Sequence, residues 1–453
     1  MKVLKFGGTS VGSAERIGSI ANLLPANEPC IVVLSAMAGT TNTLIEITNK
    51  AKSDNMHEAM EMIRTLENKY IATVKKLYQS QTYQNRGELF INDTFLQISR
   101  KVAGGLSEKG SREIIAFGEM ISTALFQMYL TELGFKSAYI PALNFMRIDK
   151  DKEPDYFYIE ENINRSIQSS PFVQIYITEG FICRNATGEI DNLGRGGSDY
   201  SAAIIGNVIN ANEVQIWTDI DGVHNNDPRY VENTSPLRHL SYDEAAELAY
   251  FGAKILHPST IQPCRVKEIP VLLKNTLQPQ DNGTLISAFR NPQGIKAIAA
   301  KDGITTINIQ SSRMLLAYGF LNKVFEVFNQ LQTAVDMITT SEVAISLTID
   351  NADKLDEITK QISKFSNVTV SKNQTIICIV GDFEADKNGY AALVFDALKE
   401  IPIKMISYGS SSNNISISVD SQHKVKALNL LQKIVASRTA TLNSELIAQP
   451  VNI

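Results

Sequence analysis

A glycine pair near the start of the chain is a candidate anion-binding turn. The apolar run at residues 3–6 predicts a short strand; Gly7 and Gly8 follow it, ahead of a helical pattern over residues 17–24. A strand that enters a helix through glycines presents backbone N–H groups to an anion, and Lys5 adds a positive charge there. The pattern therefore predicts a phosphate site, although two glycines alone would equally suit a plain tight turn.

A second glycine-rich segment, residues 194–199, has side chains suited to a small acid. Its glycines would let a ligand approach the backbone closely. Arg195 offers the planar guanidinium that matches a carboxylate, and Ser198 can cap a helix, bind the ligand, or do both. The alternative is a simple glycine-rich helix entry with a solvated arginine.

The pattern of strands and helices between these segments indicates the class of fold. Residues 30–35 form a continuous apolar run, which is typical of a parallel strand covered on both faces. Residues 173–178 and 214–218 read as further strands, and Ser198 is expected to open the helix between them. Strands that alternate with helices predict an α/β domain with a mostly parallel sheet.

Two further helices have clear sequence signals. An apolar stripe predicts a long helix over residues 57–79. Ser241 and Glu244 form a capping box, and we expect the helix that they open to end near residues 257–258.

The pattern changes after about residue 290, where two units with a similar order of strands and helices follow each other. Each unit has a strand, a helix and a strand, with a further β-branched run after the helix. The strand, helix and strand are expected at 304–310, 320–329 and 343–349 in the first unit, and at 375–380, 390–398 and 415–419 in the second. The further runs are 334–338 and 403–406.

The bulk composition sets the broad class of the protein. A chain of 453 residues, 44% hydrophobic and 20% charged, is typical of a soluble globular protein with two or three domains. The net charge of −5 gives no electrostatic footprint for nucleic acid or an anionic membrane. The sequence shows no signal peptide and no apolar run near the roughly 20 residues of a membrane span. Its four cysteines are widely scattered, so we expect a cytoplasmic location.

Several ordered motifs resemble those of the aspartokinases in the amino acid kinase family. They are Lys5-Phe-Gly-Gly-Thr-Ser-Val11, Leu34-Ser-Ala-Met-Ala-Gly-Thr-Thr-Asn42, Phe117-Gly-Glu119, Thr178-Glu-Gly-Phe181, Leu193-Gly-Arg-Gly-Gly-Ser-Asp-Tyr200, Trp217-Thr-Asp219 and Phe251-Gly-Ala-Lys254. The resemblance continues past residue 400 and so covers essentially the whole chain. It implies an amino acid kinase fold over residues 1–290, a mostly parallel sheet sandwiched by helices.

The resemblance also implies two ferredoxin-like βαββαβ ACT modules, which we place at residues 296–370 and 371–453. In the family one module is inserted into the other, so the run at 295–300 is expected to pair with the second module. Paired ACT modules usually meet across a subunit interface, which implies a homodimer or a dimer of dimers.

The implied reaction transfers the γ-phosphoryl group of ATP to the β-carboxylate of L-aspartate and gives 4-phospho-L-aspartate, the step that opens lysine, threonine and methionine biosynthesis. A carboxylate nucleophile is already ionised at pH 7, so no catalytic base is required, and none of the five histidines lies in a catalytic or metal-binding pattern. Lys5 would stabilise the transferring phosphoryl group. The expected catalytic residues are Lys5, Gly7, Gly8 and Asp199.

Residue by residue, the resemblance assigns a substrate pocket and a nucleotide loop. Arg195 would hold the α-carboxylate of aspartate and Glu119 its α-amino group, and Ser35, Thr41 and Ser198 would complete the pocket. The nucleotide residues would be Thr218, Asp219, His224, Arg229 and Lys254; His224 departs from the tyrosine of close relatives. ATP would enter with Mg²⁺, without an all-protein metal cage, and with Asp199 and Asp219 as outer-sphere partners.

A lysine effector site is expected in the first ACT module. By resemblance, the pocket would be lined by Met314, Phe320, Leu321, Val335, Asp336 and Glu342. Asp336 stands in an apolar run and suits an ammonium group, with a structural turn or interface as its alternative role. Ala317 and Ala334 replace serines of a close relative, which implies weaker lysine binding, and threonine stays open as the effector.

Two other functions compete with this interpretation. A sister amino acid kinase acting on glutamate, N-acetylglutamate, carbamate or UMP would generally lack the paired ACT modules. A catalytically inactive amino-acid sensor would not need Lys5, Arg195 and Asp219, all of which are present.

Overall fold

The computed structural model describes residues 1–53, 55–194, 196–252, 258–290, 294–311, 318–383, 389–409 and 411–448, without the side chains of residues 258, 259 and 437–448. The chain forms two compact units. The first contains Met1–Val223 with Leu256–Ala288, and the second contains His224–Ile255 with Phe289–Ile453. The division at 1–290, 296–370 and 371–453 stays a prediction.

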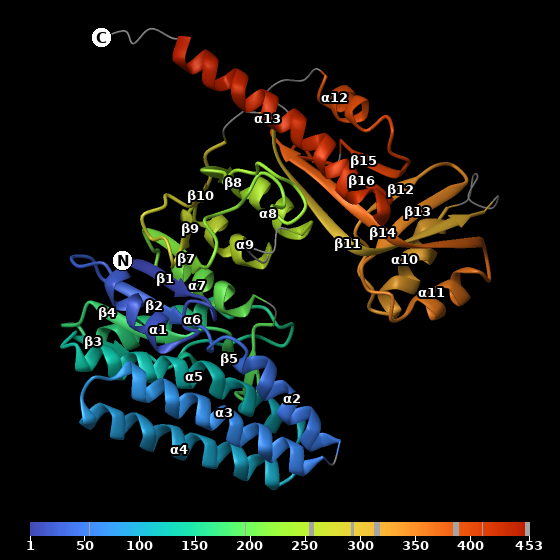
Figure 1. Ribbon diagram of the computed structural model, residues 1–453. Coiled ribbons are helices and arrows are strands. Elements are labelled where there is room, and N and C mark those ends of the chain that lie inside the picture. Colours follow the sequence, from blue (N-terminus) through green and yellow to red (C-terminus); the bar gives the residue numbers. More distant parts are fainter. Residues whose placement is uncertain are drawn as a thin grey trace. The chain divides into compact units, whose positions relative to one another are not determined.

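The first unit is built on a sheet whose strands are almost all parallel, as the sequence predicts (Figure 1). The strand order is β3 (Ser137–Tyr139), β4 (Ile175–Glu179), β2 (Cys30–Leu34), β1 (Lys2–Phe6), β7 (Glu213–Thr218), β9 (Val271–Asn275) and β10 (Thr284–Ser287). Within this order only β10 runs antiparallel, to β9. Strand β1 lies between β2 and β7, with Lys5 opposite Val33 and Ile216. This central position explains why four of its five residues are buried.

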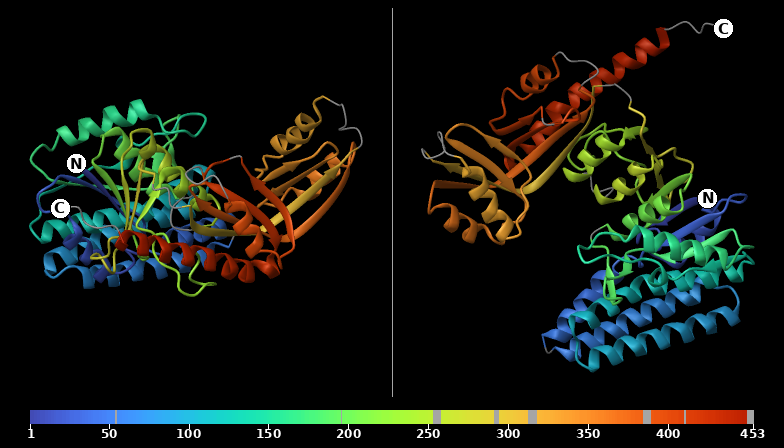
Figure 2. Two further views of the ribbon diagram at one scale, coloured as in Figure 1. Left: turned by 90° about the horizontal axis from the view of Figure 1, so that it is seen from above. Right: turned by 180° about the vertical axis from the view of Figure 1, so that it is seen from behind.

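Helices enclose this sheet and form a separate layer (Figure 2). The helices are α1 (Ala14–Ile20), α2 (Thr40–Lys52), α3 (Met56–Leu77), α4 (Gln81–Ala103), α5 (Glu108–Glu132), α6 (Tyr156–Gln168), α7 (Gly197–Val208) and α9 (Pro258–Val266). The expected apolar stripe of α3 is buried, from Ile63 to Leu77, and belongs to one core with β1 and β2. A short hairpin, β5 (Ile182–Arg184) and β6 (Ile190–Asn192), lies apart from the main sheet.

Helix α5 is long and apolar enough by composition to cross a membrane, although the sequence shows no continuous apolar run of that length. In the fold, 56% of its most apolar stretch is buried, and it packs against α2 and α4. A core helix passes the same test, so the composition of α5 is weak evidence for a membrane span.

The second unit contains a six-stranded antiparallel sheet. Its strand order is β12 (Ile338–Thr340), β13 (Ala344–Ile349), β11 (Ile295–Gln310), β14 (Asn367–Gly381), β16 (Asn414–Asp420) and β15 (Ile403–Tyr408). Helices α10 (Phe320–Gln330) and α11 (Leu355–Ile362) contribute to one hydrophobic core, and α12 (Tyr390–Ala397) and α13 (Lys424–Ala448) contribute to another. Each predicted strand–helix–strand unit therefore has its own core.

Strands β11 and β14 are each long enough to serve both cores. Residues Ile295 to Lys301 pair with the second half of β14, and Ile304 to Gln310 pair with its first half. The run at 295–300 thus lies beside the part of β14 that contains Ile376 to Gly381. The predicted module boundary at residue 370 falls inside β14.

The segment before this sheet contains β8 (His239–Ser241) and α8 (Tyr242–Tyr250). The capping box is confirmed: Glu244 N donates to Ser241 Oγ, and Ser241 N donates to Glu244 Oε2. The expectation that this helix continues to residues 257–258 is wrong, because it ends at Tyr250. Gly252 then adopts φ +116°, where an added Cβ would lie 2.3 Å from Ala300 O, so only glycine fits.

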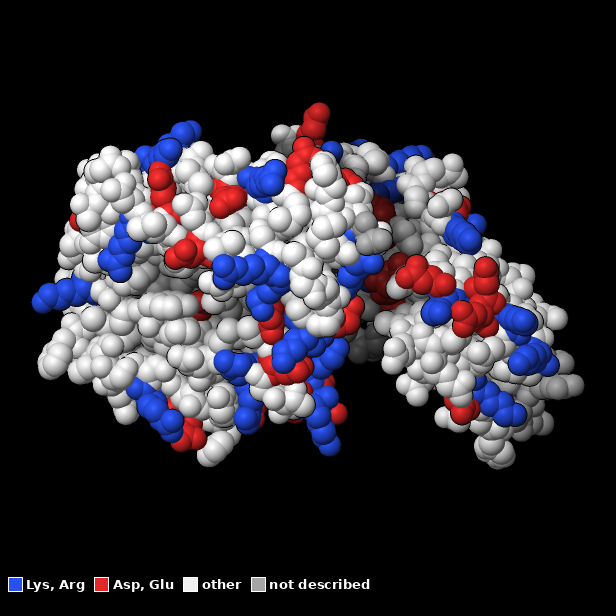
Figure 3. Space-filling view, turned by 90° about the horizontal axis from the view of Figure 1, so that it is seen from below, with Lys and Arg blue, Asp and Glu red and all other residues white. Residues whose placement is uncertain are grey.

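Charges of both signs are interspersed on the face of the molecule drawn in Figure 3. This mixture agrees with the small net charge of −5.

Candidate active site

A cavity of about 460 Å³ in the first unit brings together residues from distant parts of the sequence. The ends of β1 and β2 meet there with α5 and with the first turns of α2 and α7. Seven predicted site residues line it: Lys5, Gly8, Ser35, Thr41, Glu119, Ser198 and Asp199. Gly7 lies just outside this set, and its N–H donates to Trp217 O. The structure therefore joins the two glycine-rich segments in one pocket.

The N-termini of α2 and α7 both lie at this cavity. Each helix has a left-handed glycine at its N-cap, Gly39 for α2 and Gly196 for α7, so no N-cap side chain accepts a hydrogen bond from the N–H groups of the first turn. Thr41 and Ser198, in the first turns, line the cavity. The first N–H groups of a helix carry a partial positive charge, so two converging N-termini favour a ligand with more than one anionic group.

Lys5 and Asp199 form an ion pair inside the cavity. Lys5 Nζ lies 2.5 Å from Asp199 Oδ1, and the two side chains are 10% and 15% exposed. A lysine with one carboxylate partner keeps further N–H donors for other oxygens. A phosphoryl group that enters here would therefore meet a positive charge already fixed in place.

Glu119 is a buried acid whose second oxygen is unpaired. The residue is 3% exposed, and its Oε1 accepts a hydrogen bond of 3.3 Å from Ala36 N. Its Oε2 is buried and has no hydrogen-bond partner among the residues that the structure describes. Burial raises the pKa of Glu119 to about 8, the Ala36 N–H opposes this shift, and the charge of Glu179 adds to it. A cationic ligand group would supply the missing partner.

The entry to α7 packs so closely on the end of β4 that only glycine fits. A Cβ on Gly180 would lie 2.6 Å from Ser198 Cβ, and one on Gly197 would lie 2.7 Å from Phe181 Cδ2. Phe181 itself has φ +66°, rare for an aromatic residue, and its N–H donates to Ser201 Oγ at 2.9 Å. This packing holds Ser198 and Asp199 at the cavity.

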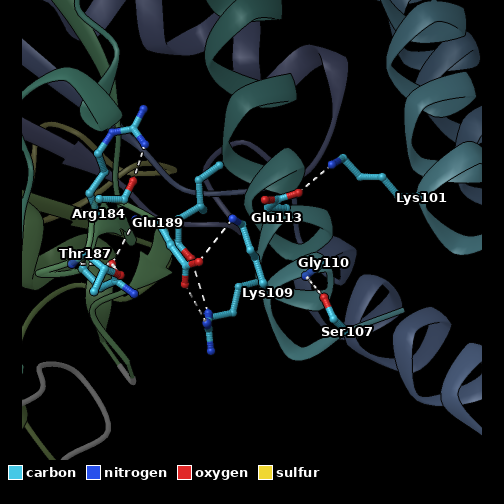
Figure 4. Close-up of polar contacts among 12 residues, drawn as sticks. Lys101, Ser107, Lys109, Gly110, Glu113, Arg184, Thr187 and Glu189 are labelled. Atoms are coloured by element: carbon cyan, nitrogen blue, oxygen red, sulfur yellow. Dashed lines mark hydrogen bonds and ion pairs between the residues drawn. The ribbon is translucent and has the colours of Figure 1, made fainter. Parts of the chain in front are cut away.

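Helix α5 also holds the hairpin that leads into the second glycine-rich segment (Figure 4). Lys109 Nζ lies 3.2 Å from Glu189 Oε1, and Arg112 Nε donates to Ile190 O at 3.3 Å and lies 3.8 Å from Asp191 Oδ1. Because β6 ends at Asn192, two residues before Gly194, these contacts fix the start of the loop. The same helix thus positions Glu119 and the neighbouring wall of the cavity.

Comparison with known proteins agrees with this geometry. Residues 1–275 match the model of the amino acid kinase family, and residues 377–434 match that of an ACT domain. The chain is 33% identical to Aspartokinase 1, chloroplastic, of Arabidopsis thaliana, over 95% of this chain and 79% of that protein. The chain belongs to the aspartokinase family.

Solved aspartokinase structures have the same fold. The structure of E. coli aspartokinase III in complex with aspartate and ADP, described as the R-state, matches with a TM-score of 0.83 and 30% identity over 97% of this chain and 99% of that one. The same enzyme in complex with lysine and aspartate, the T-state, matches with a TM-score of 0.79 and 31% identity, over 96% and 99% of the two chains. The amino acid kinase and ACT folds expected from the sequence are confirmed.

The predicted nucleotide residues of this aspartokinase are distributed over both units. Thr218 ends β7 in the first unit and Asp219 follows it, and Thr218 Oγ1 donates to Asp219 Oδ1 at 3.2 Å. In the second unit, His224 Nδ1 lies 2.9 Å from Thr234 Oγ1, and Arg229 binds Asp227 through Nε and Nη2, which raises the pKa of Arg229. Lys254, Arg195 of the substrate pocket and Met314 of the effector pocket lie outside the described residues.

The other predicted effector residues differ in exposure. Phe320 is 8% exposed and belongs to the core of α10 and α11, where its ring meets that of Phe365 edge-on. Val335 packs at the edge of that core, whereas Leu321 and Glu342 are exposed. Asp336 is partly buried as a residue, but its side chain is only 3% exposed and is ion-paired with Lys301.

Sequence reasoning gave no role to Glu179, which is buried beneath the site. Its Oε2 accepts from Ala142 N at 2.8 Å and its Oε1 from the Tyr139 hydroxyl, while burial raises its pKa. The signal for it was an acid at the end of the apolar strand that contains Ile175 and Ile177.

No metal cage is found within the described part of the chain, where no group of three His, Cys, Asp or Glu side chains could hold an ion. Mg²⁺ usually depends on phosphate oxygens, water and one or two carboxylates, and Asp199 in the cavity provides such a carboxylate.

Proposed function

We propose that the cavity binds L-aspartate and the γ-phosphoryl group of ATP, and that the β-carboxylate of aspartate attacks the phosphorus. The observation that carries this assignment is the unpaired Oε2 of Glu119 beside the Lys5–Asp199 ion pair. One end of the cavity thus offers an anion to an ammonium group. The rest offers positive charge to carboxylate and phosphoryl oxygens.

Each residue of the cavity has a separate role in the proposed reaction. Glu119 binds the α-ammonium group, and Arg195, assigned from its sequence motif, binds the α-carboxylate. The helix N-termini and Lys5 then face the β-carboxylate and the phosphoryl oxygens. One β-carboxylate oxygen forms a bond to phosphorus as the bond to the ADP oxygen breaks, and no proton has to move. Lys5 neutralises the charge on the phosphoryl group during transfer.

The magnesium ion of the nucleotide would be held mainly by phosphate oxygens and water. Asp199, and Asp219 at the end of β7, are the carboxylates that we assign to its hydration shell. When bound, Mg²⁺ neutralises phosphate charge.

The test is hydroxylamine trapping of the acyl phosphate with ATP and a series of acids. We expect L-aspartate to give hydroxamate. Succinate, which lacks the ammonium group, should give almost none because Glu119 would remain unpaired. L-glutamate and N-acetyl-L-glutamate test the sister kinases. Equal reaction of glutamate, or of succinate, would contradict the assignment of this cavity to aspartate.

We further infer that lysine is the allosteric effector and acts through Asp336. Support comes from the buried carboxylate and from the lysine complex of E. coli aspartokinase III. Inhibition requires that lysine bind one conformational state better than another. Activity measured with lysine, threonine and methionine tests this; inhibition by threonine alone would replace the effector and leave the catalytic assignment unchanged.

We keep a homodimer or dimer of dimers, and a cytoplasmic location, as parts of the proposal. Sedimentation of the protein with and without lysine tests the assembly. A monomer under both conditions would contradict it.

A further inference from the structure

Lys301 lies between two carboxylates in the second unit. Its Nζ is 2.7 Å from Asp336 Oδ1 and 2.8 Å from Asp350 Oδ2. The hydroxyl of Tyr250 also donates to Asp336 Oδ1, at 3.1 Å, and the ring of Tyr250 lies under the ammonium group, 4.7 Å from Nζ to the centroid. An acid, an aromatic ring and an ammonium group therefore already meet at Asp336.

The cluster has one more negative charge than positive charge. Asp336 is the buried member, with a side chain 3% exposed, whereas the Asp350 side chain is 43% exposed. Asp336 Oδ2 has no hydrogen-bond partner within the described ranges. Burial raises the pKa of Asp336, and the neighbouring Lys301 opposes that shift. A buried carboxylate with a free oxygen is costly, so a second ammonium group would stabilise the cluster.

We propose that Lys301 occupies, in the effector-free protein, the position at Asp336 that the ammonium group of an amine effector would take, and that the effector binds by displacing Lys301 towards Asp350. This inference rests on the proposed regulation through Asp336 and adds an internal competitor to it. After the displacement, each carboxylate has one ammonium partner. The ligand class is a primary alkylammonium, which includes the side chain of lysine.

Competition of this kind has a direct consequence for affinity. An effector must separate Lys301 from Asp336 before its own ammonium group can bind there, so Lys301 weakens binding. Asp350 acts in the opposite direction, because it offers Lys301 a partner after the displacement. The two residues should therefore change effector affinity with opposite signs, which a purely structural ion-pair cluster would not do.

The first experiment measures lysine binding calorimetrically in the full-length protein. Lys301→Met should lower the dissociation constant by about 10-fold, the lower end for losing a competing charge-assisted hydrogen bond. Asp350→Asn should raise it several-fold. Lys323→Met removes a positive charge from the exposed face of α10 and should leave it within two-fold of the wild-type value. Weaker or unchanged binding by Lys301→Met would overturn the inference.

A second experiment tests Lys301 even if lysine is not the effector. Lys301→Ala should leave room for n-butylammonium chloride, which should raise the thermal unfolding midpoint of this variant more than that of wild type; n-butanol at the same concentration should not. If no protein binds lysine but n-butylammonium stabilises Lys301→Ala, the lysine regulation is wrong and the inference stands. Equal responses of Lys301→Ala and wild type to n-butylammonium would overturn the inference.

Discussion

Lys5 and Asp199 form an ion pair of 2.5 Å across nearly two hundred residues of sequence. Lys5 is the last residue but one of the central strand β1, and Asp199 lies in the first turn of α7, which packs against that strand. The pair fixes the lysine in the cavity without using all of its donors.

Lys5→Ala should lower kcat by about 100- to 1,000-fold, the range for removing one donor from a developing charge. The KM for ATP should change far less, because the contact matters most as phosphoryl charge redistributes. Steady-state kinetics with both substrates measures this. Lys2→Ala is the control, since Lys2 is in the same strand but pairs with Glu28 and Glu213. Near-normal kcat with weakened ATP binding would make Lys5 a ground-state anchor.

Glu119→Gln should raise the KM for aspartate by about 10- to 150-fold, because a charge-assisted bond to the ammonium group is lost. Wild-type affinity for aspartate should rise as the pH increases towards 8, because binding requires the ionised carboxylate and the pKa of Glu119 is about 8 in the free protein. Calorimetry from pH 6 to pH 8 measures the trend. The dependence should be flat in Glu119→Gln, and a variant that keeps the wild-type slope would exclude Glu119 as its source.

The same pKa has a consequence for stability. Between 4.5 and about 8 the unfolded chain has lost the proton of Glu119 and the folded protein keeps it, so this group lowers the free energy of unfolding as the pH rises. Glu119→Gln cannot ionise. Without ligand, the free energy of unfolding of Glu119→Gln relative to that of wild type should therefore rise by about 2–5 kcal/mol from pH 5 to pH 9. Urea unfolding at both pH values measures this difference; a constant difference would contradict the raised pKa.

Arg112→Ala should raise the KM for aspartate by up to about 5-fold with little change in kcat, since partly exposed ion pairs contribute at most about 1 kcal/mol. The reason is that Arg112 holds the β5–β6 hairpin ahead of Gly194. Lys101→Ala is the matched control, because Lys101 pairs with Glu113 and does not contact the hairpin (Figure 4). Equal effects of the two substitutions would show that the hairpin contacts do not support the site.

Gly180→Ala should cost about 1–3 kcal/mol of stability and weaken aspartate binding, because the new methyl group would overlap Ser198. Gly110→Ala is the comparison, since its nearest neighbour is the flexible end of Leu106 at 3.2 Å and alanine favours a helix. Thermal unfolding and aspartate KM report both effects. A Gly180→Ala protein as stable and active as wild type would contradict the close packing at α7.

The sequence predicts which residues belong to this site better than it predicts which of them contact one another. Lys5 and Gly8 were expected together because strand, turn and helix are local features. The pairing of Lys5 with Asp199 depends on how α7 packs against β1, which no local pattern encodes. The sequence does not predict a role for Glu179 for a related reason, because its hydrogen-bond partners, Tyr139 and Ala142, are about forty residues away in the chain.

Two strand and helix boundaries show the same limit. The sequence predicts separate runs at 295–300 and 304–310, yet β11 continues through Asp302 and Gly303 with a shift in register. The end of α8 was placed too late because the helical pattern gave no sign that Gly252 must pass close to Ala300. In both cases a tertiary neighbour overrides the local signal.

Strands β11 and β14 run uninterrupted from one hydrophobic core of the second unit to the other. Cutting the chain between the two repeat units would divide β14 and leave half of β11 without its hydrogen-bonded neighbour. Neither half can then melt without exposing backbone groups of the other, so the two modules should unfold together as a single cooperative element. Any strain that a ligand imposes at one core is carried into the other by two continuous backbones rather than across a flexible joint.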